Sequence, residues 1–118
     1  MLPPIILSIA GSDCSGGAGI QADIKTISAL GGYAASVITA VTAQNTLGVQ
    51  SVYPIPADMV KAQITSVMDD LRPDAVKIGM VHGASIVTAI VDCLQTYTLE
   101  CIVYDPVMIS TCLLYTSD

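Results

Sequence analysis

The sequence predicts an α/β fold with three layers (αβα), in which helices cover both faces of a mostly parallel sheet. Short runs of aliphatic residues alternate with longer segments whose apolar residues recur at helical spacing, which is typical of βαβ units. The composition agrees with this prediction, because 53% of the 118 residues are hydrophobic and 12% are charged, against about 25% charged in an average domain. Such a composition suits strands that are buried on both faces.

The first predicted strand covers residues 5–10 and ends where a loop of small residues begins (residues 11–18, the glycine loop). Such a loop exposes backbone N–H groups and lets a ligand approach the chain closely. The loop leads into a predicted helix over residues 18–30, which Gly31 and Gly32 end. Three isoleucines at helical spacing mark the face that this helix should bury, namely Ile20, Ile24 and Ile27.

The rest of the chain continues the alternation of strands and helices. The expected strands cover residues 35–42, 49–53, 75–78 and 101–104, and the expected helices cover residues 58–71 and 84–97. Polar or small residues follow the carboxyl ends of several predicted strands, and they include Gly11, Gln44, Gly79 and Asp105. Because the carboxyl ends of parallel strands share one edge of an open sheet, where ligands bind, we expect a small-molecule site there.

The glycine loop does not fit a nucleotide P-loop, which requires the pattern G-x-x-x-x-G-K-[ST]. Gly11 and Gly16 have the required spacing, but Gly17 and Ala18 stand where the lysine and the hydroxyl residue should be. Residues 17–22 match a dinucleotide-binding fingerprint, G-x-G-x-x-A. That fingerprint should directly follow the strand and should be followed about 20 residues later by an acidic residue. Neither condition is met, so dinucleotide binding is the disfavoured alternative.

The charge balance argues against a nucleic-acid partner, because the formal net charge is −6 and the four lysines and arginines form no basic cluster. A metal site is not expected either. The four cysteines show no C-x-x-C spacing, and a single histidine, His82, accompanies them. Asp105 stands at the ligand-binding edge, but its position before a proline favours a turn over a metal ligand.

Nothing in the sequence predicts export or membrane insertion. The first cation is Lys25, so no basic segment precedes the apolar residues near the start, and a secretion signal is not expected. No uninterrupted apolar run reaches the ~18 residues that a membrane helix needs. We therefore expect a soluble, cytoplasmic protein.

Four motifs occur in order along the chain: AGSDCSGGAGIQAD at residues 10–23, VTAQNT at 41–46, KIGM at 77–80 and DPVM at 105–108. Together they closely resemble the hydroxymethylpyrimidine/phosphomethylpyrimidine kinases of thiamine biosynthesis, which belong to the ribokinase-like superfamily. The resemblance covers residues 4–111, and four ordered motifs make it more specific than any single glycine pattern. It implies a ribokinase-like fold, of which this chain would hold the N-terminal part in truncated form.

The resemblance also implies which residues bind the substrate. In the family, the residues matched by Asp23 and Gln44 contact the pyrimidine ring, and the glycine matched by Gly11 lets the ring pack against the backbone. Met80 and Val107 match positions that form apolar walls of the pocket. An amide such as that of Gln44 offers a donor and an acceptor together, which complements the edge of an aminopyrimidine.

Each of these residues also has a purely structural interpretation. Judged by position alone, Asp23 stabilises the first turns of a helix through the helix dipole, and Gln44 is a turn amide. The glycine would be an ordinary turn residue, and the two apolar residues would belong to the core. Ser12 and Asp13 are expected to cap the glycine loop and are given no catalytic part.

The resemblance implies ATP-dependent phosphorylation of 4-amino-5-hydroxymethyl-2-methylpyrimidine and of its monophosphate, by an enzyme that is a homodimer at full length. Family members are longer, and their ATP and Mg²⁺ sites and catalytic residues lie in a second half that does not follow Met108 here. We therefore expect no catalytic residue in this chain and no phosphoryl transfer by it alone. Residues 1–111 would be the substrate-binding half of one domain, and residues 112–118 a non-native tail that looks like translated sequencing adapter.

Two alternative functions remain open. One is a pyridoxal kinase of the same superfamily, which shares the architecture and acts on a ring of similar size. The other is a non-catalytic pyrimidine-binding half-domain that a partner chain completes.

Overall fold

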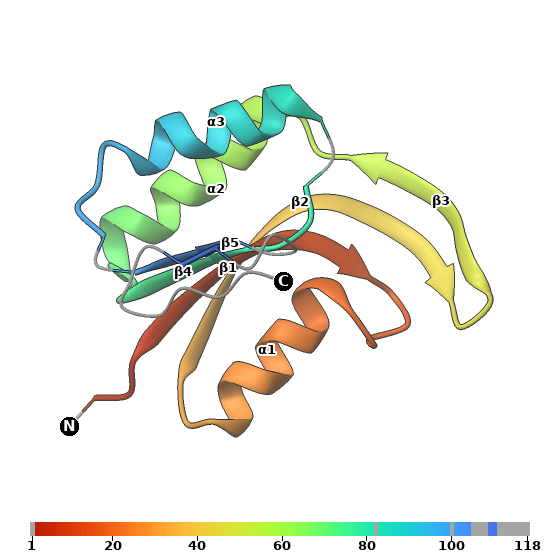
Figure 1. Cartoon of the computed structure of the whole chain (residues 1–118), viewed down its shortest axis with the longest axis horizontal. Helices are drawn as coiled ribbons and strands as arrows, with labels where there is room; N and C mark the ends of the chain where they lie inside the picture. The colour runs from red at the N-terminus through yellow and green to blue at the C-terminus, as the bar shows by residue number, and fades with distance from the viewer. Residues whose placement is uncertain (1, 82, 100, 105–108, 111–118) are drawn as a thin grey trace.

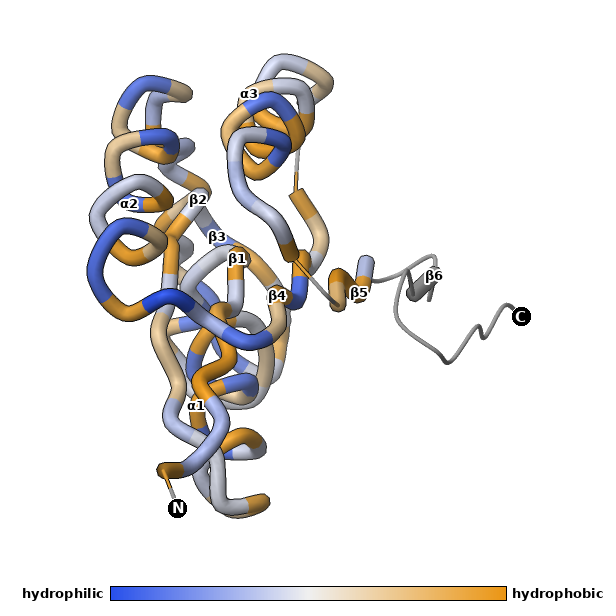
Figure 2. The backbone as a smooth tube through the Cα atoms, turned by 90° about the vertical axis from the view of Figure 1, so that its left-hand side faces the viewer, coloured by the Kyte–Doolittle hydropathy of each residue, from blue (hydrophilic) through white to orange (hydrophobic). Residues whose placement is uncertain are grey.

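Helices lie on both faces of a central sheet in the computed structural model, which describes residues 2–81, 83–99, 101–104 and 109–110 (Figure 1). Helix α1 (Gly19–Ala29) covers one face, and α2 (Ala57–Asp70) and α3 (Ala84–Leu94) pack against each other on the opposite face. Figure 2 shows the same arrangement from the side. The three-layer αβα fold that the sequence predicts is therefore confirmed.

The sheet has six strands in the order β3-β2-β1-β4-β5-β6. The inner strands pair in parallel, whereas β3 and β6 pair antiparallel at the two edges. The strands are β1 Ile5–Asp13, β2 Tyr33–Asn45, β3 Gly48–Pro54, β4 Ala75–Ile78, β5 Ile102–Tyr104 and β6 Ile109–Ser110. No sequence pattern indicates β6, and α3 ends at Leu94 rather than at residue 97. Parallel pairing brings the carboxyl ends of β1, β2 and β4 to one edge of the sheet.

The first strand does not end before Gly11, as the sequence suggests, but continues to Asp13. The pairing of β1 with β2 changes register between Ala10 and Ser12, so Gly11 lies at an irregularity inside the strand. An irregularity of this kind bends a strand and re-aims the side chains that follow it. It therefore sets the direction of Ser12 and Asp13, which continue β1 and pair with Val41 and Thr42 of β2.

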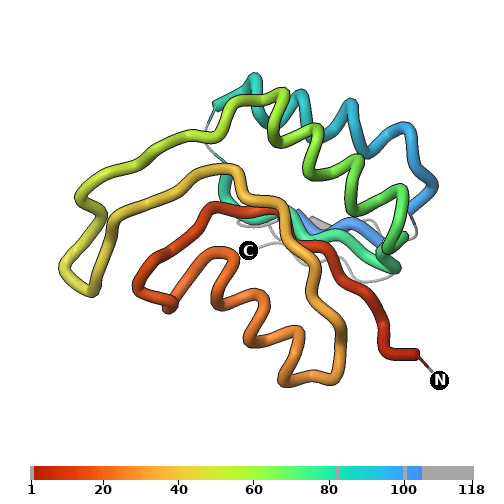
Figure 3. Tube along the Cα trace, turned by 180° about the vertical axis from the view of Figure 1, so that it is seen from behind, coloured from red at the N-terminus to blue at the C-terminus, as the bar shows by residue number. Residues whose placement is uncertain are grey.

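The second strand is longer than predicted and forms with β3 an antiparallel ribbon that projects beyond the helices (Figures 1 and 3). The pairing of β2 with β3 begins at Ala40. At Ile38, before that point, the Gln63 side chain of α2 takes the place of a strand. Its Oε1 accepts the Ile38 N–H at 2.9 Å, and its Nε2 donates to the Ile38 carbonyl at 2.9 Å. These bonds pair backbone groups that would be costly to leave unsatisfied.

The main hydrophobic core lies between the sheet and the helices α2 and α3. Its most deeply buried side chains are those of Leu7, Ile9, Val37, Val60, Ile64, Val76 and Ile90. The packing under α1 is thinner than the sequence suggests, because Ile20 is buried whereas Ile24 and Ile27 are only half-buried. On this face the strands present polar side chains, Ser8 and Lys77, which bond to α1. No helix in the described part of the chain is long and apolar enough to span a membrane.

Candidate functional site

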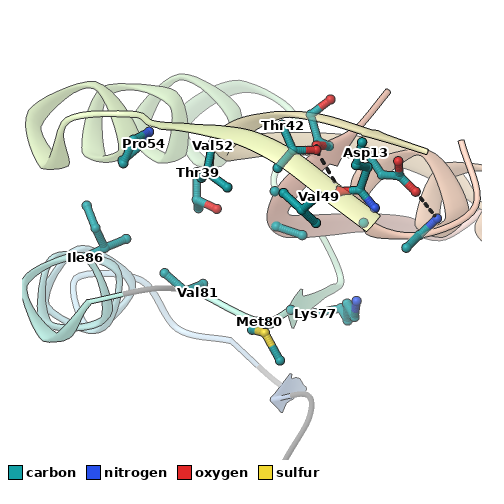
Figure 4. A pocket seen from close by; sticks show the side chains of 18 residues that line it. Asp13, Thr39, Thr42, Val49, Val52, Pro54, Lys77, Met80, Val81 and Ile86 are labelled. Carbon is teal, nitrogen blue, oxygen red and sulfur yellow. Dashed lines mark hydrogen bonds between the residues drawn. The ribbon is translucent and has the colours of Figure 1, made fainter. Parts of the chain in front are cut away.

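A cavity of about 350 Å³ opens at the carboxyl ends of β1, β2 and β4 (Figure 4). Its volume lies within the range of about 300–1,000 Å³ that is usual for small-molecule sites. The β2–β3 ribbon supplies Val49 and Val52 on one side, and the segment after β4 supplies Met80 and Val81 on the other. The topology thus brings together segments that are far apart in the sequence, as the sequence predicts for this edge.

The glycine loop is held in shape by Asp13, whose side chain is buried. Its Oδ1 accepts the backbone N–H and the hydroxyl of Ser15 at 2.9 and 2.7 Å, and its Oδ2 accepts the N–H groups of Gly17 and Ala18 at 3.1 and 2.8 Å. Bonding by the Ser15 hydroxyl, reinforced by the three N–H groups and opposed by burial, holds the pKa of Asp13 below its ordinary value of 3.8. The expectation that Asp13 caps this loop is confirmed.

The hydrogen bonds to Asp13 also show that one expectation about the glycine loop is wrong. The sequence suggests that the glycine loop exposes N–H groups to a ligand, but those of Ser15, Gly17 and Ala18 already donate to Asp13. The Gly16 N–H donates to the Asp13 carbonyl at 2.9 Å. The loop is therefore organised by its own carboxylate and does not form an anion site like that of a P-loop.

Gln21 of α1 fixes this loop to the helix and was not singled out by the sequence patterns. Its Oε1 accepts the Asp13 N–H at 2.8 Å, and its Nε2 donates to the Ser12 hydroxyl at 2.8 Å. Gln21 lies in the first turn of α1, whose start has no side-chain cap, and is within reach of the end of β1. It also belongs to the motif at residues 10–23, which is the sequence signal that could have identified it.

Gln44, expected to bind substrate, is half-buried and lines the cavity near the end of β2. Its side-chain amide lies 2.8 Å from the hydroxyl of Thr42, which donates its one proton to the Ser12 carbonyl at 2.6 Å. Its backbone is tied to Cys14, since the Gln44 N–H donates to Sγ at 3.3 Å and the thiol donates to the Gln44 carbonyl at 3.2 Å. The other end of the amide makes no hydrogen bond within the described residues, so it is available to a ligand.

Asp23, also expected at the substrate, does not line the cavity. Its carboxylate accepts the buried Ser8 hydroxyl at 2.6 Å and lies 2.9 and 3.1 Å from the Lys77 ammonium. Lys77, which the sequence patterns did not assign to the site, does line the cavity. Ser8 and Lys77 face each other on the paired strands β1 and β4, so the sheet itself creates this cluster.

The other expected site residues have different placements. Met80 is 59% exposed and lines the cavity, so its alternative interpretation as a core residue is wrong. Gly11 also lines the cavity, and a Cβ there would lie 3.8 Å from the Ala40 carbonyl oxygen, which is an ordinary contact. The backbone packing by itself therefore does not require glycine at this position. Val107 lies outside the described residues.

Comparison with known proteins agrees with the resemblance seen in the motifs. A family model described as phosphomethylpyrimidine kinase matches residues 13–112. The chain is 58% identical to the hydroxymethylpyrimidine/phosphomethylpyrimidine kinase of Escherichia coli over 88% of its own length and 39% of that protein. A crystal structure of phosphomethylpyrimidine kinase from Clostridium difficile superposes with a TM-score of 0.85 at 54% identity, covering 95% of this chain and 48% of that one.

At lower sequence identity, the chain is also similar to pyridoxal kinases. The pyridoxal kinase of Staphylococcus aureus, solved in complex with AMP-PCP, superposes with a TM-score of 0.81 at 33% identity, covering 92% of this chain and 40% of that chain. This chain thus spans about half or less of the length of the relatives that it matches. Its fold is that of the ribokinase-like pyridoxal and phosphomethylpyrimidine kinases, and the motifs and the family model agree on the closer affiliation. The chain therefore belongs to the phosphomethylpyrimidine kinase family.

Proposed function

We propose that this chain forms the substrate-binding part of a kinase that uses ATP to phosphorylate 4-amino-5-hydroxymethyl-2-methylpyrimidine and its monophosphate in thiamine diphosphate biosynthesis. The observation that carries the proposal is the cavity at the carboxyl ends of β1, β2 and β4, lined by Gly11, Gln44 and Met80. A flat, neutral ring needs apolar walls and a few polar anchors, and this lining offers both.

Each residue has a distinct part in this proposal. The free end of the Gln44 amide hydrogen-bonds the edge of the aminopyrimidine, while Met80 and Val107 pack against the ring. Gly11 presents backbone to the ring without a side chain in between. Asp23 acts from behind the cavity lining through its contacts with Lys77. These residues bind and orient the substrate, and we assign none of them to phosphoryl transfer.

The described residues do not fit a site for ATP or for Mg²⁺. The glycine loop lacks the lysine of a P-loop, and the Gly17 and Ala18 N–H groups already donate to Asp13. No group of three or more His, Cys, Asp or Glu side chains that could hold a metal comes together within the described ranges. We therefore assign ATP and Mg²⁺ to the part of the family's fold that is not contained in this chain.

Binding of 4-amino-5-hydroxymethyl-2-methylpyrimidine to the 118-residue chain, measured by isothermal titration calorimetry, tests the proposal. We expect saturable binding to one site, and we expect Gln44→Leu to weaken it. Losing the hydrogen bonds of a partly buried amide costs about 1–3 kcal/mol, so the dissociation constant should rise by about fivefold to 100-fold.

Gln50→Leu is the matched control, because Gln50 is exposed on β3 and, among the described residues, its side chain bonds only to the Gly48 carbonyl. This variant should bind the pyrimidine as the parent chain does. Absence of binding to the parent chain, or equal losses in both variants, would refute the proposed site.

A pyridoxal kinase is the second candidate, and the structural similarity to the Staphylococcus aureus pyridoxal kinase favours it. The lower identity to that enzyme, 33% against 54% for the Clostridium difficile protein, ranks it behind the pyrimidine kinase. Competition between pyridoxal and the hydroxymethylpyrimidine for the same site distinguishes the two. Stronger binding of pyridoxal would reverse the order.

The full-length protein is proposed to be a cytoplasmic homodimer. A third candidate function is a non-catalytic pyrimidine-binding half-domain, because the described residues by themselves form no nucleotide site. Sequencing the source DNA across the codons for residues 111–118 separates this candidate from the kinase. A reading frame that continues into a glycine-rich second half supports the kinase, and a true stop codon after Asp118 supports the binding module.

A further inference from the structure

We propose that Lys77 is a specificity-determining residue of this site, whose ammonium binds the phosphate ester of the phosphorylated substrate, and that Asp23 and Ser8 are positioning residues for it. The inference rests on the proposed function and deepens it. It assigns a cation to the cavity, and it gives Asp23 an indirect part in place of direct contact with the ring.

The contacts of Lys77 leave one donor of its ammonium unused. Its Nζ lies 2.9 Å from Asp23 Oδ2 and 3.1 Å from Asp23 Oδ1, so at most two of its three N–H bonds are used by this carboxylate. No other hydrogen bond to the ammonium is formed within the described residues. Lys77 lines the cavity and Asp23 does not, so Lys77 is the member of this ion pair that borders the cavity and has a donor left for a ligand.

The cluster behind Lys77 is built to hold the ammonium in place. The Ser8 hydroxyl, which is fully buried in β1, donates to Asp23 Oδ2 at 2.6 Å and fixes that carboxylate from the side of the sheet. Position 79 provides the space, because a Cβ on Gly79 would lie 3.3 Å from Lys77 Nζ and 3.0 Å from the Ala10 Cβ. A side chain at position 79 would press on Ala10 and shift the end of Lys77 by a few tenths of an ångström, so the glycine leaves room for the lysine beside the cavity.

The charges of the cavity indicate the kind of ligand group that suits this ammonium. The charged side chains among the lining residues are those of Asp13 and Lys77. The Asp13 carboxylate already accepts four hydrogen bonds from the glycine loop, which leaves Lys77 as the group that can respond to an anion. Figure 4 shows Lys77 beside Met80, on the side of the cavity opposite Thr42 and Val49. A ring anchored near Thr42 by Gln44 would therefore have Lys77 across the cavity from its anchor.

The two substrates of the proposed function differ in charge at one substituent. The hydroxymethyl group is a neutral acceptor, whereas a phosphate monoester carries a charge of about −1.5 to −2 near neutral pH. Hydrogen bonds from an ammonium to a charged oxygen are about twice as strong as those between neutral groups. A lysine that only braces α1 against β4 would affect both ligands equally, whereas a lysine that binds the phosphate would affect the monophosphate more.

Isothermal titration of the chain with the hydroxymethylpyrimidine and with its monophosphate tests the proposal. Lys77→Gln alone would leave the Asp23 carboxylate unpaired and repelling phosphate, so the decisive variant is the double substitution Asp23→Asn/Lys77→Gln. We expect it to weaken binding of the monophosphate by about tenfold more than binding of the alcohol. Asp23→Asn alone keeps the ammonium and should keep most of the preference for the monophosphate.

Asp58→Asn/Lys61→Gln is the matched control, because both side chains are exposed on α2 and this double substitution, like the decisive one, leaves the net charge unchanged. It should leave the ratio of the two dissociation constants unchanged, and circular dichroism should report a folded chain for every variant. If the double variant binds both ligands more weakly by the same factor, or if the control changes the ratio of the two dissociation constants as much as the double variant does, the role of Lys77 is overturned. The proposed function is not affected by either result. Failure of the parent chain to bind either ligand overturns the proposed function and this proposal with it.

Discussion

At the scale of single residues, the Asp13 carboxylate determines the shape of the glycine loop. Donation by Ser15, Gly17 and Ala18 stabilises its charged form, so its pKa in the folded chain lies below 3.8. In the unfolded chain these donors are lost and the pKa returns to its ordinary value. The carboxylate therefore contributes stability that is fully present above the unfolded pKa and is lost as the pH falls through the lower, folded pKa.

The substitution Asp13→Asn tests this prediction through the pH dependence of thermal unfolding, followed by circular dichroism. An amide has one acceptor oxygen in place of two, so the variant should melt at a lower temperature than the parent at pH 7. The difference should shrink as the pH is lowered below 3.8, because the parent then also loses its carboxylate. Asp58→Asn, which changes an exposed carboxylate at the start of α2, should show no comparable effect. A difference for Asp13→Asn that is constant over this pH range would contradict the prediction.

At the scale of elements, the start of α1 is fixed against β1 by a close backbone contact at Gly19. This residue has φ +60°, and a Cβ there would clash with the Gly11 carbonyl oxygen. Gly31, after the end of α1, also has a positive φ of +90°, but a Cβ there would meet no atom within 4 Å. Both positions incur the strain of a left-handed conformation, about 1–2 kcal/mol for a residue with a side chain. Only a substitution at Gly19 adds a steric conflict.

We therefore expect Gly19→Ala to lower the free energy of unfolding by more than Gly31→Ala, which should cost about 1–2 kcal/mol. Urea denaturation of both variants measures this difference. Gly19→Ala should also weaken binding of the pyrimidine, because Gly19 lines the cavity and its displacement moves the start of α1. Equal destabilisation by the two substitutions would mean that the contact with Gly11 has no energetic weight.

The sequence predicts most of the helices and strands but only part of the site. Hydrophobic periodicity located α2 and the inner strands, because burial against a sheet requires it. The bend at Gly11 was missed, since a bulge leaves the apolar pattern of β1 intact. Motifs directed attention to Gln44 and Met80, which do line the cavity. Lys77 was missed as part of the site because its partner Asp23 is 54 residues away in sequence, and only the sheet brings them together.

At the scale of the whole molecule, the two faces of the sheet differ in how much apolar surface they bury. Helix α2 buries Val60, Ile64 and Met68, and α3 adds four more buried side chains to the same core. Helix α1 buries only Ile20 and is otherwise held by polar contacts such as the Lys77–Asp23 ion pair. A buried aliphatic side chain contributes about 1.5–3 kcal/mol, whereas the attraction within a partly buried ion pair such as this one is largely offset by the desolvation of its two charges. The layer under α1 is therefore the weaker one.

Native-state hydrogen exchange should detect this difference. We expect the amides of α1 to exchange through local opening at a lower free energy than those of α2 and of the centre of β1, which should open only with global unfolding. Because Ala18 and Gly19 line the cavity, a bound pyrimidine should slow exchange in α1 more than in α2. Exchange as slow in α1 as in α2 without ligand would refute the idea of a weak layer. If ligand binding slowed amide exchange equally in all helices, binding would stabilise the whole fold. It would then not act mainly on α1, through the loop that Asp13 and Gln21 hold at the cavity.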